Sequence, residues 1–207
     1  MFSDLARDDV FRLETQRLWL RWPKASDAPA VTRYAGNAEV AHWTSAIPHP
    51  YPPGGAEQFI LRARANNAAG TALHLVVTPL RNPREVIGGI GLDLRMGKLT
   101  LGYVFAPDVW GKGFATEAAC ALVDGAFSLT EAEALHSGAF LDNARSRRVL
   151  EKAGFAPDGV SEEYSEARGA AQKLARVRID RQDWLARRAA FAASVMNARD
   201  ARAAIAR

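Results

Sequence analysis

Alternating apolar and polar positions are the clearest signal in the chain, and they predict seven strands. The strands cover residues 17–22, 73–78, 86–92, 99–105, 135–141, a segment from 155 onward, and 173–179. In the first strand, Leu18, Leu20 and Trp22 fall on one side, as in a half-buried strand. Turn signals at Asn82–Pro83 and Met96–Gly97 separate the next three strands, which we expect to form an antiparallel meander.

Helical periodicity fills the intervals between these strands. The predicted helices cover residues 27–36, a segment ending near 66, 114–127, 143–154, and the region from about 183. Residues 42–55 hold four prolines and two glycines and are expected to form a loop. The strand–helix–strand unit over 99–141 is typical of a parallel crossover, so we expect a single α/β domain with a mixed sheet. Ligands of such units bind at the carboxyl ends of the strands, where residues 106–113 lie.

Composition narrows the class of protein. The 207 residues are 48% apolar and 24% charged, as in a globular domain with an ordinary core. Cys120 is the only cysteine, which excludes an intrachain disulfide and a cysteine-based metal site, and we expect no metal. No segment approaches the roughly 18 apolar residues of a membrane span, and the N-terminal segment is too charged for a secretory signal. We therefore expect a cytoplasmic protein without membrane contact.

The distribution of charge argues against one class of partner. The chain has 27 Lys and Arg against 23 Asp and Glu, a surplus of four. Residues 181–207 contain six Arg and two Asp, so the whole surplus lies in this tail. A DNA-binding domain would carry its basic surplus on a face of the fold, and we expect no DNA partner.

A glycine-containing loop, WGKGFATE at residues 110–117, is the strongest chemical signal. Gly111 and Gly113 lie between a predicted strand and a predicted helix, where backbone N–H groups and a helix N-terminus attract phosphate or pyrophosphate. The loop lacks the Gly-Lys-Ser/Thr of a P-loop, and Thr116 stands in place of the third glycine of a dinucleotide fingerprint. A tight turn without a ligand is the alternative interpretation of the two glycines.

Two segments together resemble the GCN5-related N-acetyltransferases (GNAT). They are LGYVFAPDVWGKGFATEA at 101–118 and DNARSRRVLEKAGF at 142–155. The segment LETQRLWLR at 13–21, with Asp183–Trp184, resembles the RimJ/RimL-like branch, which acetylates ribosomal-protein N-termini. The resemblance covers about residues 12–188. It implies a GNAT fold: a mixed, mostly antiparallel sheet of about six to seven strands with flanking helices and a splayed central parallel pair.

The resemblance also implies acetyl-CoA as donor and assigns its site. The backbone of Val104, Phe105 and Ala106 would bind the pantetheine arm and the acetyl carbonyl, with the Val104 N–H stabilising the oxyanion. The amides of 111–115 would cradle the pyrophosphate, and Asn143, also a helix-cap candidate, would bond the pantetheine. The implied donor-site residues are Val104, Phe105, Ala106, Trp110, Gly111, Lys112, Gly113, Phe114, Ala115, Asn143 and Ser146. Trp110 stands where the family more often has Gln or Arg, and Lys112 would add charge to the loop.

The catalytic groups are less complete than the donor site. Many members of the family have a Tyr that protonates the departing thiolate, but here that position is Leu150. Ser146 is the candidate replacement, with a bound water as the alternative. The base that takes a proton from the amine stays open among Asp93, His136, His42 and His49.

The expected reaction is direct transfer of an acetyl group to a primary amine, either a protein N-terminal α-amine or a small-molecule amine. The acceptor site is expected in the loop 42–55, with Trp43 and Tyr51, and in the segment 161–170, which carries Glu162, Glu163 and Glu166. Two alternatives remain: a non-catalytic acyl-CoA-binding module of the same fold, and a ribosome- or RNA-associated protein that acts through the basic tail.

Three segments are expected along the chain: an N-terminal extension at 1–11, the acetyltransferase domain at 12–182, and an Ala/Arg-rich C-terminal helix at 183–207. This last helix is expected to pack on the domain, to project as a basic arm, or to form a homodimer. The apolar side chains available for a dimer contact are Trp184, Leu185, Phe191 and Val195.

Overall fold

An antiparallel meander forms the middle of the sheet in the computed structural model, which describes residues 11–190. Its strands are β3 (Ala72–Pro79), β4 (Gly88–Arg95) and β5 (Lys98–Phe105), as the turn signals predict. The strand β2 (Leu18–Arg21) pairs with β3, and the three-residue strand β1 (Arg12–Glu14), which the sequence pattern did not predict, adds the edge. The sheet therefore has eight strands rather than seven, in the order β1-β2-β3-β4-β5-β6-β8-β7.

A single parallel contact joins the meander to the second half of the sheet. This half consists of β6 (Ala134–Phe140), β7 (Ala156–Ser165) and β8 (Ala170–Asp180). β5 and β6 pair in parallel at Thr100 and His136, whereas β6, β8 and β7 pair antiparallel. Beyond this contact β5 and β6 diverge, so the expected splayed parallel pair is confirmed. The carboxyl halves of the two strands border a gap in the sheet.

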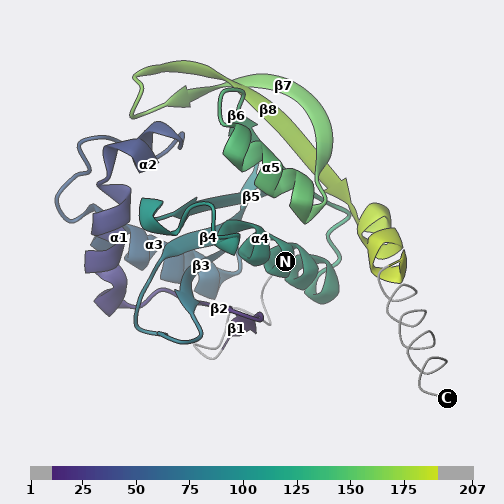
Figure 1. The fold of residues 1–207 in the computed structure, drawn as a ribbon, viewed down its shortest axis with the longest axis horizontal. Coiled ribbons are helices and arrows are strands. Elements are labelled where there is room, and N and C mark those ends of the chain that lie inside the picture. Colours follow the sequence, from purple (N-terminus) through teal and green to yellow (C-terminus); the bar gives the residue numbers. More distant parts are fainter. Residues whose placement is uncertain (1–10, 191–207) are drawn as a thin grey trace.

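The helices follow the predicted order, with three short additions, two of which are 3-10 helices. Their bounds are η1 (Ala25–Asp27), α1 (Ala28–Ala35), α2 (Ala38–His42), α3 (Gly55–Ala69), η2 (Pro107–Val109), α4 (Phe114–Leu129) and α5 (Ala144–Ala153). The short helix α2 was not predicted, and it forms because the Asn37 side chain caps it by accepting from the N–H groups of Glu39 and Val40. Figure 1 shows β7 and β8 arching from the C-terminal side of the molecule toward α2.

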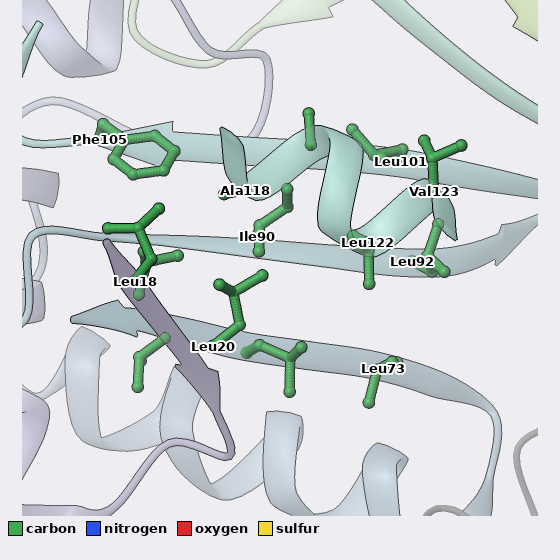
Figure 2. Close-up of a cluster of buried hydrophobic side chains, with 14 of the residues drawn as sticks. Leu18, Leu20, Leu73, Ile90, Leu92, Leu101, Phe105, Ala118, Leu122 and Val123 are labelled. Atoms are coloured by element: carbon green, nitrogen blue, oxygen red, sulfur yellow. The ribbon is translucent and has the colours of Figure 1, made fainter. Parts of the chain in front are cut away.

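One face of the sheet packs against α4. Leu92 and Leu101 are register partners on β4 and β5, so their side chains share this face. Figure 2 shows both of them beside Leu122 and Val123 of α4, and all four are at most 2% exposed. Burying such side chains stabilises a fold by roughly 1.5–3 kcal/mol each. This packing fixes the N-terminus of α4 next to the end of β5.

The opposite face carries α3. The ring of His74 on β3 lies edge-on to that of Phe59 on α3, with 6.0 Å between centroids. The buried Asn67 side chain joins helix to strand, because it bonds both backbone groups of His74, at 2.7 and 2.8 Å. The two faces of the sheet are thus covered by different helices, which matters for the cavities described below.

Residues 181–190 form a helix that packs on the domain. The Trp184 side chain is 7% exposed, its Nε1 donates to Asp124 Oδ1 at 2.6 Å, and its ring lies 5.3 Å from that of Phe127. Leu185 is exposed, while Phe191, Val195 and the rest of the tail lie outside the described residues. Among residues 11–190, no helix has the length and apolar character that a membrane crossing requires.

Candidate active site

The glycine loop adopts the backbone conformation that its sequence suggests. Gly111 has φ of 76° and Gly113 has φ of 80°, both in the left-handed region that favours glycine. Gly113 is the N-cap residue of α4. The first N–H groups of a helix lack intrahelical partners. The loop and the helix start therefore have a backbone arrangement that suits an anion, and the pyrophosphate site stays a prediction.

Arg17, the residue before β2, holds this loop in place, a role that the sequence did not reveal. Its Nε donates to Glu117 Oε2 at 2.6 Å, and its Nη1 donates to the carbonyl oxygen of Lys112 at 3.1 Å. Its guanidinium also lies over the Phe114 ring, 4.6 Å from the centroid. Glu117 is held in turn by the Thr15 hydroxyl at 2.6 Å. Burial raises the pKa of Glu117, but these hydrogen bonds and the Arg17 charge outweigh it and lower the pKa overall.

A cavity of about 390 Å³, here called the helix-side cavity, lies between the ends of β5, α4 and α5. All of the predicted donor-site residues line it except Ala106 and Lys112. Ala106 is buried, and its N–H donates to the Ile87 carbonyl oxygen at 2.9 Å. Lys112 is exposed and contributes its carbonyl to the Arg17 brace. Arg145, Arg148 and Lys152 add positive charge to the lining.

The backbone of β5 presents alternate residues to the gap. The Leu101 carbonyl accepts from Ser137 Oγ of β6 at 2.8 Å, so this residue faces β6. The N–H and C=O of a strand residue point to the same side, and successive residues alternate. The backbone N–H and C=O groups of Tyr103 and Phe105 therefore point into the gap, whereas those of Val104 and Ala106 point to β4. The Val104 N–H was expected to stabilise the oxyanion, but it does not point into the gap. A sequence pattern does not show which edge of a strand becomes free.

Tyr103 and Ser146 meet at the gap. Tyr103 Oη lies 2.7 Å from Ser146 Oγ, and either oxygen can be the donor. The Asn143 side chain caps α5 by accepting from the Ser146 N–H at 3.0 Å, as the cap interpretation predicted. Burial raises the pKa of Tyr103 to about 12, although the hydrogen bond with Ser146 opposes the shift. Leu150 is fully buried in the core, so this position does not face the cavity.

A second cavity of about 540 Å³, here called the hairpin-side cavity, lies between the sheet and the β7–β8 hairpin. Thr100 and His136 belong to the sheet face opposite Leu101, and both line it. Trp43, Thr44, Tyr103 and Ser146 line both cavities. The two cavities therefore lie on opposite faces of the sheet and meet where β5 and β6 diverge.

One histidine–aspartate pair lines the hairpin-side cavity, and a second contributes its aspartate. His136 Nδ1 is 3.7 Å from Asp158 Oδ2, and both residues line the cavity. Burial, with Lys98 and Arg178 nearby, lowers the pKa of His136, against the opposing charge of Asp158. Asp93 pairs with His74 at 3.1 Å. Burial raises the pKa of Asp93, but the hydrogen bond and charge of His74 reverse this and lower it overall.

The β7–β8 turn is fastened to the end of α2. Arg168 Nε donates to the His42 carbonyl oxygen at 2.9 Å, and Nη1 donates to Asp142 Oδ2 at 2.9 Å. The Arg168 guanidinium lies over the rings of Trp43 and Phe140, at 5.1 and 4.7 Å from their centroids. The β7–β8 hairpin therefore forms one side of the hairpin-side cavity.

The remaining acceptor-site candidates separate into two groups. Trp43, Glu162 and Glu163 line the hairpin-side cavity, as do the base candidates Asp93 and His136. The side chains of His42, His49, Tyr51 and Glu166 line neither cavity. Of the four base candidates, Asp93 and His136 are therefore the two that line a cavity.

Comparison with known proteins agrees with this geometry. Residues 17–156 match the family described as the acetyltransferase (GNAT) domain. The uncharacterized N-acetyltransferase p20 of Bacillus licheniformis is 28% identical over 160 residues, which is 76% of this chain and 89% of the relative.

Solved structures share the fold. A ribosomal-protein-S5-alanine acetyltransferase from Vibrio fischeri has a TM-score of 0.72 and 22% identity, covering 84% of this chain and 98% of that one. Mycobacterium smegmatis RimJ, in complex with CoA-disulfide, has a TM-score of 0.71 and 23% identity, covering 84% of this chain and 88% of that one. Because the family match spans more than half of the chain, and the described sheet, loop and gap agree with it, this protein belongs to the GNAT acetyltransferases and is an enzyme of the acyltransferase type.

Proposed function

We propose that this enzyme transfers the acetyl group of acetyl-CoA directly to a primary amine. The observation that carries the proposal is the meeting of two cavities at one gap in the sheet, at Tyr103 and Ser146. A donor in one cavity and an acceptor in the other would bring the thioester and the amine together there. No covalent enzyme intermediate is then needed, since proximity alone supplies a large part of such an acceleration.

The helix-side cavity is the proposed donor site. The loop amides around Gly111 and Gly113 suit the pyrophosphate, and the positive side chains of Arg145, Arg148 and Lys152 suit the phosphates of a nucleotide. The side chains of Trp110, Phe114 and the rest of the lining would contact the apolar parts of the donor.

The proposed oxyanion donor follows from the alternation along β5. The N–H groups of Tyr103 and Phe105 face the gap, and such a group aimed at the thioester carbonyl would stabilise the oxyanion formed on attack. Val104 itself lines the helix-side cavity. Ser146 remains the proposed acid for the departing thiolate, because its hydroxyl lies at the gap.

The hairpin-side cavity is the proposed acceptor site. His136 is the favoured base, because its Nδ1 faces Asp158, which leaves Nε2 to accept a proton through water. Asp93 is less suited, since its lowered pKa makes it a weaker base. Glu162 and Glu163 would attract a cationic amine. The structural neighbours include a ribosomal-protein acetyltransferase, so a protein N-terminal α-amine heads the acceptor classes, with small amines second.

Calorimetric titration with acetyl-CoA tests the donor site. Gly113→Trp should abolish binding, because it adds a large side chain at a residue with φ of 80°. Gly54→Trp is the matched control, since Gly54 is also the left-handed N-cap of a helix, α3, and an added Cβ meets nothing within 4 Å. A folded wild type that does not bind acetyl-CoA would refute the proposal.

Turnover is then measured as release of the CoA thiol with a panel of amines. The panel contains short peptides with N-terminal Ala, Ser, Thr or Met, and small polyamines. Turnover of any member supports the transferase, and the preferred member identifies the acceptor class. Tight binding without turnover of any amine would instead favour a non-catalytic acyl-CoA-binding module.

A further inference from the structure

The Tyr103–Ser146 pair offers a route between the two cavities that neither the family's usual Tyr nor the sequence motifs indicate. Both residues line both cavities, and their hydroxyl oxygens are 2.7 Å apart. Ser146 sits in the first turn of α5, and Tyr103 sits on the β5 edge that faces the gap. The two hydroxyls therefore bridge the gap from its two sides.

We propose that Tyr103 and Ser146 form a relay that carries a proton from the acceptor amine to the departing CoA thiolate. The proposal rests on the proposed function and deepens it. Ser146 acts next to the sulfur, and Tyr103 lies between the acceptor nitrogen and Ser146, so that it takes a proton from the first and gives one to the second. The pair takes over the task that a Tyr at position 150 has in many relatives, which the buried Leu150 cannot perform.

The proton balance of the reaction requires two transfers. The ammonium form of the acceptor gives up one proton before attack, to the base in the hairpin-side cavity. The neutral nitrogen then forms a bond to the carbonyl carbon, and the carbon–sulfur bond breaks with its electron pair on sulfur. The second N–H proton passes to Tyr103 Oη while Tyr103 gives its own to Ser146 Oγ, and Ser146 gives its own to the sulfur. Both hydroxyls end as they began, and the products are an amide and free CoA.

The chemistry of the pair suits a relay better than a base. A phenol buried as Tyr103 is stays protonated at neutral pH, so its oxygen can donate one proton and accept another in the same step. A buried phenol needs a hydrogen-bond partner in any role. Here the nearer partner is a second hydroxyl, Ser146 Oγ, which can itself pass a proton on, whereas the Ser146 carbonyl oxygen is a longer contact at 3.3 Å.

The test compares Tyr103→Phe, Ser146→Ala, the double variant and Ser146→Thr with the wild type. Tyr164→Phe is the matched control, because this tyrosine is 55% exposed on β7 and lines neither cavity. The rate is thiol release at saturating acetyl-CoA with the best amine of the panel, measured in mixtures of H2O and D2O. Acetyl-CoA affinity and thermal unfolding are measured on every variant.

We expect Tyr103→Phe and Ser146→Ala each to lower kcat by about tenfold or more, with acetyl-CoA affinity changed less than about twofold. The double variant should be no slower than the slower single variant, because the two hydroxyls act as one unit. The dependence of rate on deuterium fraction should be curved in the wild type, from two protons moving together, and linear in both single variants. Ser146→Thr, which keeps the hydroxyl, should retain most of the rate.

Three results would overturn the relay: a Tyr103→Phe rate within about twofold of wild type, losses that multiply in the double variant, or unchanged curvature in the deuterium dependence. If Tyr103→Phe does not fold, the comparison of Ser146→Ala with Ser146→Thr decides, and equal rates for these two refute the relay. Failure of the proposed function is a separate result, because the wild type itself would then acetylate no amine.

Discussion

Removing the Arg17 brace should weaken donor binding without changing the chemistry. Arg17 touches neither cavity directly, yet it holds the Lys112 carbonyl and the Glu117 carboxylate on the two sides of Gly113. In Arg17→Ala the glycine loop would lose both contacts and sample other conformations. Donor binding would then have to restore the bound conformation at a free-energy cost.

The size of the effect follows from the contacts. A charge-assisted hydrogen bond contributes about 1.5–3 kcal/mol, but the Arg17 side chain is 45% exposed, so solvent screening reduces the Glu117 pair to about 1 kcal/mol. The bond to the Lys112 carbonyl adds about 1 kcal/mol. If the loop must recover about 2 kcal/mol on binding, the Kd for acetyl-CoA rises about thirtyfold.

Titration calorimetry with acetyl-CoA, together with steady-state kinetics, measures this directly. Arg17→Ala should raise Kd and the KM for acetyl-CoA with kcat nearly unchanged. The Kd of Arg17→Lys should lie between those of the wild type and Arg17→Ala, because Lys keeps the charge but not the forked geometry. Arg188→Ala is the control, since the Arg188 guanidinium also lies over an aromatic ring, that of Trp184, and donates to Ser128 Oγ, but Arg188 lines neither cavity. An Arg17→Ala enzyme whose Kd stays within twofold of wild type would refute the reasoning.

Other parts of the structure give further predictions. Arg168→Ala releases the β7–β8 hairpin from Trp43 and should raise the KM for the amine about tenfold, with the affinity for acetyl-CoA unchanged. Equal effects on both substrates would argue against the hairpin as part of a separate acceptor site. Arg181 donates to the carbonyl oxygens of Phe127 and Ala132, at and just after the end of α4. Arg181→Ala should therefore lower the free energy of unfolding in urea by about 2 kcal/mol with an unchanged m-value. A decrease of less than about 0.5 kcal/mol would contradict this reasoning. A base must be unprotonated to act, and burial lowers the pKa of His136 below 6.5. The value of kcat/KM should therefore fall as the pH drops through this lowered pKa, and His136→Gln should lose the dependence. If the fall in kcat/KM at low pH is unchanged in His136→Gln, His136 is not the base.

The sequence predicts the parts of the site that depend on local pattern. The strand, glycines and helix of 99–127 form one contiguous unit, so periodicity and turn residues are enough to place the loop between them. Asn143 is similar, because its cap is formed with the N–H of Ser146, only three residues away. Even the absence of Tyr at position 150 is visible, since the neighbouring motif fixes the alignment.

The parts that the sequence misses depend on contacts between distant segments. Tyr103 looks like an ordinary apolar strand residue, and its role appears only when α5 brings Ser146 to the gap. Arg17 lies 100 residues from Glu117, and no spacing rule links them. The edge of β5 that faces the gap is a property of sheet pairing, which alternation along one strand does not determine. The helix α2 was missed because its five residues are too few for a periodic signal.

The single parallel contact between β5 and β6 also has a consequence for the order of events in turnover. The helix-side and hairpin-side cavities lie on opposite faces of the sheet. With acetyl-CoA in the first and the amine in the second, as proposed, each substrate would have its own entrance and neither would block the other. Double-reciprocal plots at several fixed concentrations of the second substrate should therefore converge rather than run parallel. An unreactive CoA analogue should compete with acetyl-CoA but not with the amine, and free CoA can dissociate while the acetylated product is still bound.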